Sequence, residues 1–187
     1  MIPHDTLRFK DYAVWTGPNA VYEQFEVLFM AKMSAGIVLY RFRDEQLQVF
    51  LVHPGGPFWS KKDTGVWSIP KGEYTEDEDA FKAAKREFRE ETGYEAEGNF
   101  IQLASIKQPG GKTVSAWAFE GDCDAGKIKS NTFSMEWPPR SGKQAEFPEV
   151  DRAQWFPIET AKIKLLKGQA GFIGQLCEAL GYDPHSR

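Results

Sequence analysis

Three glutamates at helical spacing are the residues of this sequence best suited to act together chemically. Glu87, Glu90 and Glu91 occupy positions i, i+3 and i+4, so a helix would present all three carboxylates on one face. Each like-charged pair at that spacing costs an isolated helix roughly 0.2–0.5 kcal/mol. Mg²⁺ prefers oxygen ligands and is bound through carboxylates and substrate phosphates. The cluster is therefore a candidate divalent metal site, although the interleaved Lys and Arg residues, taken alone, favour a solvated helix face.

A helix that ends at Gly93 is needed to position these glutamates. Phe81, Ala84 and Phe88 recur at the three- and four-residue spacing that builds an apolar stripe. Gly93 follows the last periodic residue, where a left-handed C-cap is favoured. We therefore expect a helix that is anchored to a sheet through this stripe.

The spacing of Glu78 and Arg86 sets the start of the helix. Eight residues of continuous helix would hold these two residues about 12 Å apart. They can pair only if Glu78 lies in the loop ahead of the helix and folds back. The helix is then expected to begin near Asp79, whose side chain can accept from free backbone N–H groups.

The whole stretch over residues 72–94, GEYTEDEDAFKAAKREFREETGY, resembles the signature of the Nudix hydrolase family. Every charged and glycine position of that signature is filled, and the one departure is Tyr94, where the family prefers an aliphatic residue. The resemblance implies an α/β fold, a Nudix-like α/β/α sandwich with a mixed β-sheet. It also implies a Mg²⁺-dependent pyrophosphohydrolase, with Mn²⁺ as the alternative metal. We expect the Nudix domain to span residues 34–187, after an N-terminal extension over residues 1–33.

The resemblance also implies roles for individual residues. Arg86 and Glu78 would pair and hold the catalytic loop in shape. A fourth acidic ligand in this family often precedes a strand with a tryptophan, which here favours Glu149 over Glu146 and Asp151. Either Glu87 or Glu149 would serve as the general base. The implied metal ligands are the carboxylates of Glu87, Glu90, Glu91 and Glu149 and the backbone carbonyl of Gly72.

The rest of the chain predicts elements in an order typical of an α/β domain with helices on a mixed sheet. Asp44 and Glu45 separate two β-rich runs and predict a hairpin, whereas the connection over residues 121–147 is too long for an ordinary hairpin loop. The expected strands are 35–42, 47–53, 99–107, 113–120, 131–137 and the end of 147–156, and the expected closing helices are 159–167 and 169–180.

Composition limits the classes of function and partner. A formal net charge of −4 and a pI near 5.5 argue against broad nucleic-acid binding or an anionic membrane surface. Charges interrupt every apolar run, so no membrane span is predicted. Cys123 and Cys177 make no disulfide framework and suit a reducing, cytoplasmic location.

Two further stretches are similar to the diadenosine tetraphosphate hydrolases of the family, namely WSIPKG at 67–72 and KTVSAW at 112–117. They favour a dinucleoside polyphosphate as substrate, over a nucleoside triphosphate pyrophosphohydrolase and over a non-catalytic binding module. Ala116 replaces a tyrosine that helps to stack a base in that group. Trp117, or Phe58 and Trp59, would therefore have to stack the base.

Basic residues are the candidates for binding the phosphates of a nucleoside polyphosphate. Lys71 belongs to the Pro-Lys-Gly entry into the signature. Arg140 and Lys143 belong to a positively charged loop over residues 137–143, and the guanidinium of Arg140 can fork onto a phosphate. We expect substrate contacts from these three residues and from Trp117.

Overall fold

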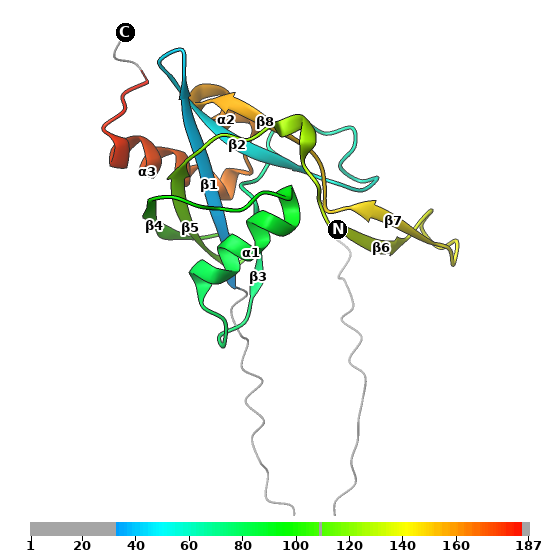
Figure 1. Ribbon diagram of the computed structural model, residues 1–187. Helices are drawn as coiled ribbons and strands as arrows, with labels where there is room; N and C mark the ends of the chain where they lie inside the picture. Colours follow the sequence, from blue (N-terminus) through cyan, green and yellow to red (C-terminus); the bar gives the residue numbers. More distant parts are fainter. Residues whose placement is uncertain (1–32, 109, 185–187) are drawn as a thin grey trace, which may run out of the picture. The chain divides into compact units, whose positions relative to one another are not determined.

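Strand β1 (Met33–Arg43) is the central strand in the computed structural model of the protein, which describes residues 33–108 and 110–184 (Figure 1). One side of β1 pairs in parallel with β5 (Thr113–Glu120). The other side is shared between two antiparallel partners. The first four residues of β1 pair with β3 (Lys71–Tyr74), and the last four pair with β2 (Gln46–Pro54).

The sheet is mixed, as the sequence predicts. Its order is β4-β5-β1-β2-β8, with β3 beside β1, and the edge strands are β4 (Phe100–Lys107) and β8 (Val150–Pro157). Only the β1–β5 pair is parallel among the described strands. The predicted β1–β2 hairpin turns at Asp44 and Glu45, both at positive φ (50° and 60°), which matches the twist of the strands.

Helices cover both faces of the sheet, because alternate side chains of each strand point to opposite faces. Helix α1 (Ala80–Thr92) packs on the face that carries Ile37 and Leu39 of β1. Helices α2 (Ile158–Lys164) and α3 (Gly171–Leu180) pack on the face that carries Val38 and Tyr40. Figure 1 shows α1 on one side of the sheet and α2 and α3 on the other. The predicted α/β/α sandwich is confirmed.

Residues 66–70 bridge the two strands that share one side of β1. Val52 and Ser68 exchange two backbone hydrogen bonds of 2.9 Å each. Ile37 N–H then donates to the carbonyl of Pro70 at 2.9 Å, immediately before β3 begins. The loop after β2 is therefore closed at its base, and the chain enters β3 in a fixed position.

The two closing helices differ from their predicted bounds. α2 ends at Lys164, because the chain becomes extended and Leu166 N–H donates to the carbonyl of Trp67 at 2.8 Å. A short 3-10 turn, η2 (Lys167–Gln169), follows, and the buried Gln169 side chain accepts from Ile69 N–H at 3.1 Å. Pairing with residues 66–70 therefore overrides local helix propensity in this segment.

Strands β6 (Thr132–Glu136) and β7 (Gln144–Pro148) form a separate two-stranded sheet within the long connection (Figure 1). This connection also contains the 3-10 turn η1 (Ala125–Lys127). Phe133 pairs with Phe147 and Met135 with Ala145 on one face of the hairpin. The sequence predicts β6 but not β7. Because β7 pairs with β6, the positively charged loop over residues 137–143 is the tip of a hairpin.

The predicted extension over residues 1–33 lies outside the described residues except for Met33, the first residue of β1. The domain boundary at residue 34 therefore stays a prediction. Among the described helices, none has both the length and the apolar character needed to cross a membrane.

Candidate active site

Helix α1 carries the glutamate cluster and is fixed at both ends in the way the sequence predicts. The side chain of Asp79 accepts from Lys82 N–H at 2.9 Å and caps the first turn. Gly93 takes a left-handed φ of 77° and donates its N–H to the carbonyl of Arg89 at 2.7 Å. The helix is anchored to the sheet by its buried residues, which are Ala83, Ala84, Phe88 and Thr92.

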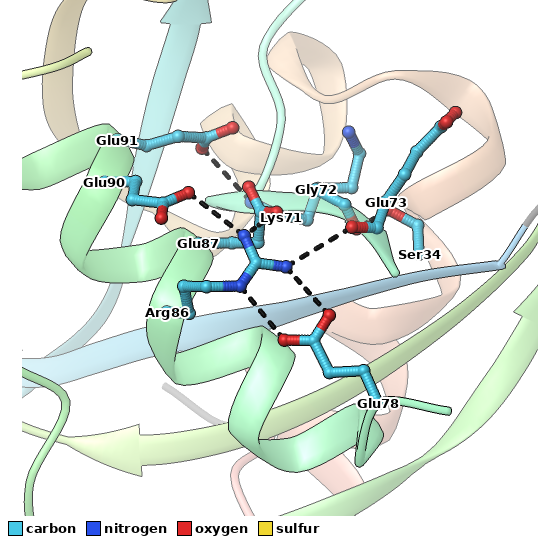
Figure 2. A network of polar contacts seen from close by, with 9 residues as sticks. All are labelled: Ser34, Lys71, Gly72, Glu73, Glu78, Arg86, Glu87, Glu90 and Glu91. Carbon is cyan, nitrogen blue, oxygen red and sulfur yellow. Dashed lines mark hydrogen bonds and ion pairs between the residues drawn. The ribbon is translucent and has the colours of Figure 1, made fainter. Parts of the chain in front are cut away.

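The guanidinium of Arg86 lies among the carboxylates of α1 and of the preceding loop (Figure 2). Its Nε and Nη2 donate to the two carboxylate oxygens of Glu78 at 3.0 and 3.1 Å, so Glu78 folds back as its spacing predicts. Nη1 donates to Glu87 at 2.6 Å and to Glu90 at 3.0 Å. Nη2 also donates to the backbone carbonyl of Glu73 at 3.4 Å. The hydrogen bonds to Glu78 above all raise the pKa of Arg86, and the network ties the loop to the helix.

Gly72 brings the start of the signature against Glu87. A Cβ added to Gly72 would lie 1.9 Å from both the Cδ and the Oε2 of Glu87, so only glycine leaves room for this carboxylate. The carbonyl of Gly72 accepts from the Oγ of buried Ser34 at 2.6 Å. Sequence reasoning missed Ser34, because only the β1–β3 register shows that the two strands meet there.

Lys71 and Glu91 are two partly buried titratable residues that lie together beside Gly72. The backbone N–H of Lys71 donates to Glu91 Oε2 at 3.1 Å (Figure 2). Burial raises the pKa of Glu91 to about 8, against the opposing charge of Lys71. Burial also lowers the pKa of Lys71 and raises that of Glu87, on which Arg86 has the opposite effect. Carboxylates withdrawn from water in this way gain from a compensating cation.

Glu149 lies with Lys71 and Glu91 in the wall of a cavity of about 180 Å³. Lys71, Glu91 and Glu149 line the cavity together with Trp59 and several apolar side chains. The charge of Glu149 also contributes, after burial, to the raised pKa values of Glu87 and Glu91. The carboxylates of α1 and of the β7–β8 link are therefore in electrostatic contact.

The acidic residues that compete with Glu149 lie in other surroundings. Asp151 Oδ1 lies 2.7 Å from Nδ1 of the buried His53. Glu146 is exposed on β7, where it pairs in register with Ser134 of β6. The backbone carbonyl of Glu149 accepts from Gly55 N–H at 2.8 Å, which fixes the residue at the cavity. These positions support the ranking of Glu149, whose role as a ligand stays a prediction.

Three candidate substrate-binding residues are not brought to this cavity. The ring of Trp117 packs 5.2 Å from that of Phe81 in the cluster beneath α1, because its position on β5 faces that helix. Arg140 and Lys143 are exposed at the tip of the β6–β7 hairpin. None of the three lines the cavity of Glu91 and Glu149. Of the four predicted substrate contacts, only Lys71 therefore lies at the carboxylates.

The predicted metal ligands fit a hard divalent cation by their chemistry, since all are oxygen atoms. Glu87 lies against the backbone of Gly72, and Glu149 lines the same cavity as Glu91. The signature and the β7–β8 link therefore supply carboxylates to one region. Within residues 33–108 and 110–184, however, no three His, Cys, Asp or Glu side chains already converge on one point. Arg86 accounts for this, because Glu87 and Glu90 both turn toward its Nη1.

Comparison with known proteins bears on the family of this chain. The NUDIX domain model matches residues 30–176. Nudix hydrolase 5 of Arabidopsis thaliana is 28% identical over 102 residues, which are 52% of this chain and 28% of that protein. The chain thus aligns with less than a third of the length of this relative.

Solved structures share the fold at low identity. An Ap4A hydrolase of C. elegans, solved as a binary complex, has a TM-score of 0.56 at 20% identity and covers 80% of this chain and 98% of its own. The NUDIX domain of Shewanella oneidensis NrtR, solved with ADP ribose, has a TM-score of 0.56 at 20% identity over 79% of this chain and 87% of its own. Because the family model matches residues 30–176, which are most of the sequence, this chain belongs to the NUDIX domain family.

Proposed function

We propose that this chain hydrolyses a phosphoric anhydride link in a nucleoside polyphosphate, with a divalent cation at the glutamates of α1. The observation that carries the proposal is the position of Glu91, Glu149 and Lys71 at one cavity, next to Glu87. Carboxylates can hold a cation there and an ammonium can face a phosphate. The complete set of signature carboxylates favours catalysis over a non-catalytic binding module.

Mg²⁺ is the proposed ion and Mn²⁺ the alternative. The carboxylates of Glu87, Glu90, Glu91 and Glu149 and the carbonyl of Gly72 would hold it. When bound, such an ion supplies neutralisation of the phosphate charge and a lower pKa for the attacking water. Lys71 would add a positive charge on the substrate side, since its side chain lines the same cavity.

Glu149 is the proposed general base. Glu87 already accepts a charge-assisted hydrogen bond from Arg86 at 2.6 Å, which occupies its Oε1 and turns the carboxylate toward the guanidinium. Glu149 is exposed at the cavity, where a water molecule can reach it. Glu149→Gln should lower kcat about 10²–10⁴-fold. A kcat near that of the wild type in this variant, with a loss of that size in Glu87→Gln, would assign the base to Glu87 instead.

A dinucleoside polyphosphate is the proposed substrate, cut asymmetrically into a mononucleotide and a shortened polyphosphate. The support comes from WSIPKG at 67–72, which places Lys71 at the cavity, and from KTVSAW at 112–117. A nucleoside triphosphate, cut with release of pyrophosphate, is the second candidate. The packing of Trp117 beneath α1 favours it, because a base-stacking residue expected on this strand faces the core.

A substrate panel tests the proposal. The protein is incubated with Mg²⁺ and dinucleoside polyphosphates, normal and oxidised nucleoside triphosphates, nucleotide sugars and capped RNA, and the products are identified. We expect turnover of dinucleoside polyphosphates that is lost in Glu91→Gln, whose fold is checked by circular dichroism. Turnover of triphosphates alone would select the second candidate. No turnover of any diphosphate-linked compound would reject catalysis.

A further inference from the structure

We infer that the apolar part of the cavity beside Glu91 and Glu149 is a nucleobase site, and that the indole of Trp59 is its stacking surface. The inference rests on the proposed function in one respect, namely that the substrate is a nucleotide. It goes further by assigning the base to a particular wall of the cavity. It also selects the loop between β2 and β3 over β5, which are the two places for base stacking that the sequence leaves open.

Apart from Ser68, the lining of the cavity divides into a charged part and an apolar part. Lys71, Glu91 and Glu149 make the charged part, where a polyphosphate belongs. The apolar part is made of Val52, Pro54, Val66, Val150 and Leu166, with Trp59. At about 180 Å³ the cavity is smaller than the roughly 300–1,000 Å³ of sites for whole drug-sized ligands. It therefore suits one planar group of a nucleotide whose phosphates extend toward the glutamates.

Trp59 is accessible and is held in place by its own loop. The residue is 37% exposed, although it is large and aromatic. The backbone N–H of Trp59 donates to the carbonyl of Gly56 at 3.3 Å, and the backbone N–H of Lys62 donates to the carbonyl of Trp59 at 2.7 Å. The carbonyl of Lys62 lies 2.8 Å from Nε2 of the buried His53. An exposed indole on an anchored loop loses little freedom when it stacks on a ligand.

The ammonium of Lys62 lies over the Trp59 ring, 4.5 Å from its centroid, and does not block the site. An exposed cation–π contact of this kind favours the arrangement with the ammonium over the ring by only about 2- to 5-fold. Stacking of a base on an aromatic side chain is worth about 5- to 140-fold in affinity. A base therefore displaces the ammonium, and Lys62 is then available to the phosphates.

Phe58 provides a matched control, because it is a neighbour with a different environment. Its side chain is 54% exposed and its ring packs edge-on against Trp137, with the centroids 5.4 Å apart. Phe58 does not line the cavity. Removal of its ring therefore changes the exposed aromatic surface of the loop without changing the proposed base site.

Equilibrium binding tests the inference without any need for turnover. Dissociation constants of ADP, GDP, CDP and UDP, and of inorganic pyrophosphate, are measured with Mg²⁺ by calorimetry for the wild type and for Trp59→Ala, Trp59→Phe and Phe58→Ala. We expect Trp59→Ala to weaken at least one nucleoside diphosphate by about 5- to 140-fold, with pyrophosphate unchanged. Trp59→Phe should restore most of the affinity, and Phe58→Ala should bind like the wild type.

The outcomes separate this inference from the proposed function. Equal nucleotide affinity in the wild type and Trp59→Ala, or equal weakening of nucleotides and pyrophosphate, would overturn the base site. A wild type that binds pyrophosphate but no nucleoside diphosphate would overturn it as well. Binding that depends on Trp59 in a protein without hydrolytic activity would uphold the base site and reject the proposed function.

Discussion

Replacing Gly72 with alanine probes the closest contact of the candidate active site. The added Cβ would lie 1.9 Å from the Cδ and Oε2 of Glu87. Non-bonded carbon atoms rest about 3.5–4.0 Å apart, so the carboxylate would have to move by about 1.5 Å or more. Glu87 would then lose its 2.6 Å contact with Arg86 and its place beside the backbone of β3.

We expect Gly72→Ala to lower kcat/KM by about 100-fold, since a misplacement of about 1 Å in a catalytic group can cost that much. The fold should survive, because the backbone of Gly72 does not lie in the left-handed region and alanine is compatible with a strand there. kcat/KM is measured with the substrate that the panel identifies. Thermal unfolding, followed by circular dichroism, reports on the fold.

Gly174→Ala is the matched control for this substitution. Gly174 lies in α3, and nothing lies within 4 Å of the position that its Cβ would take. The control should keep the kcat/KM of the wild type. Wild-type activity in Gly72→Ala would refute the place of Glu87 in the catalytic site, and an equal loss in Gly174→Ala would show that the effect is not local.

Three further predictions concern the carboxylate network and the partly buried thiol of Cys123. Mg²⁺ at 100 times its Kd should stabilise the protein by about 2.7 kcal/mol. The stabilisation is measured as a rise in Tm, which EDTA should reverse and Glu91→Gln should lack. No rise in the Tm of the wild type would contradict the metal site. Arg86→Lys should lower the free energy of unfolding in urea by about 1–3 kcal/mol, because one ammonium cannot bond both oxygens of Glu78 and also reach Glu87 and Glu90. An unchanged urea midpoint would argue against a stabilising role of Arg86 in the loop and helix. Burial raises the pKa of Cys123 to about 12, which keeps it a thiol, so its thiolate fraction at pH 8 is about 10⁻⁴. Iodoacetamide should therefore modify it about a thousandfold more slowly in the native than in the urea-unfolded protein, and equal rates would show that the thiol is not protected.

The parts of the fold that the sequence predicts are those governed by local rules. The caps at Asp79 and Gly93 and the pairing of Glu78 with Arg86 depend on spacing within one helix and its loop. The strand predicted over residues 113–120 has the same bounds as β5, because it is a β-rich run that follows a Gly turn. In these places local propensity and the tertiary structure agree.

The parts that it does not predict are decided by partners distant in the chain. Strand β7, QAEFP, has no β-branched residue and becomes a strand only by pairing with β6. The last turn of the predicted helix at 159–167 is lost to pairing with Trp67. Trp117 looks like a stacking residue in the sequence, but the register of β5 turns it toward α1. A sequence shows which residues a strand contains more readily than which face each one takes.

The backbone pair between Val52 and Ser68 lies between the loop that carries the proposed base site and the strand that leads to the proposed catalytic carboxylates. The two hydrogen bonds close the intervening loop at its base. A change in the length or sequence of the loop therefore need not displace the backbone from Ser68 to Gly72. Loops of this kind tolerate insertion better than the elements that they connect. Exchanging residues 56–65, which lie between the end of β2 and the buried Val66 and Trp67, for the corresponding loop of another family member is therefore a practical way to test a new preference on an unchanged helix α1.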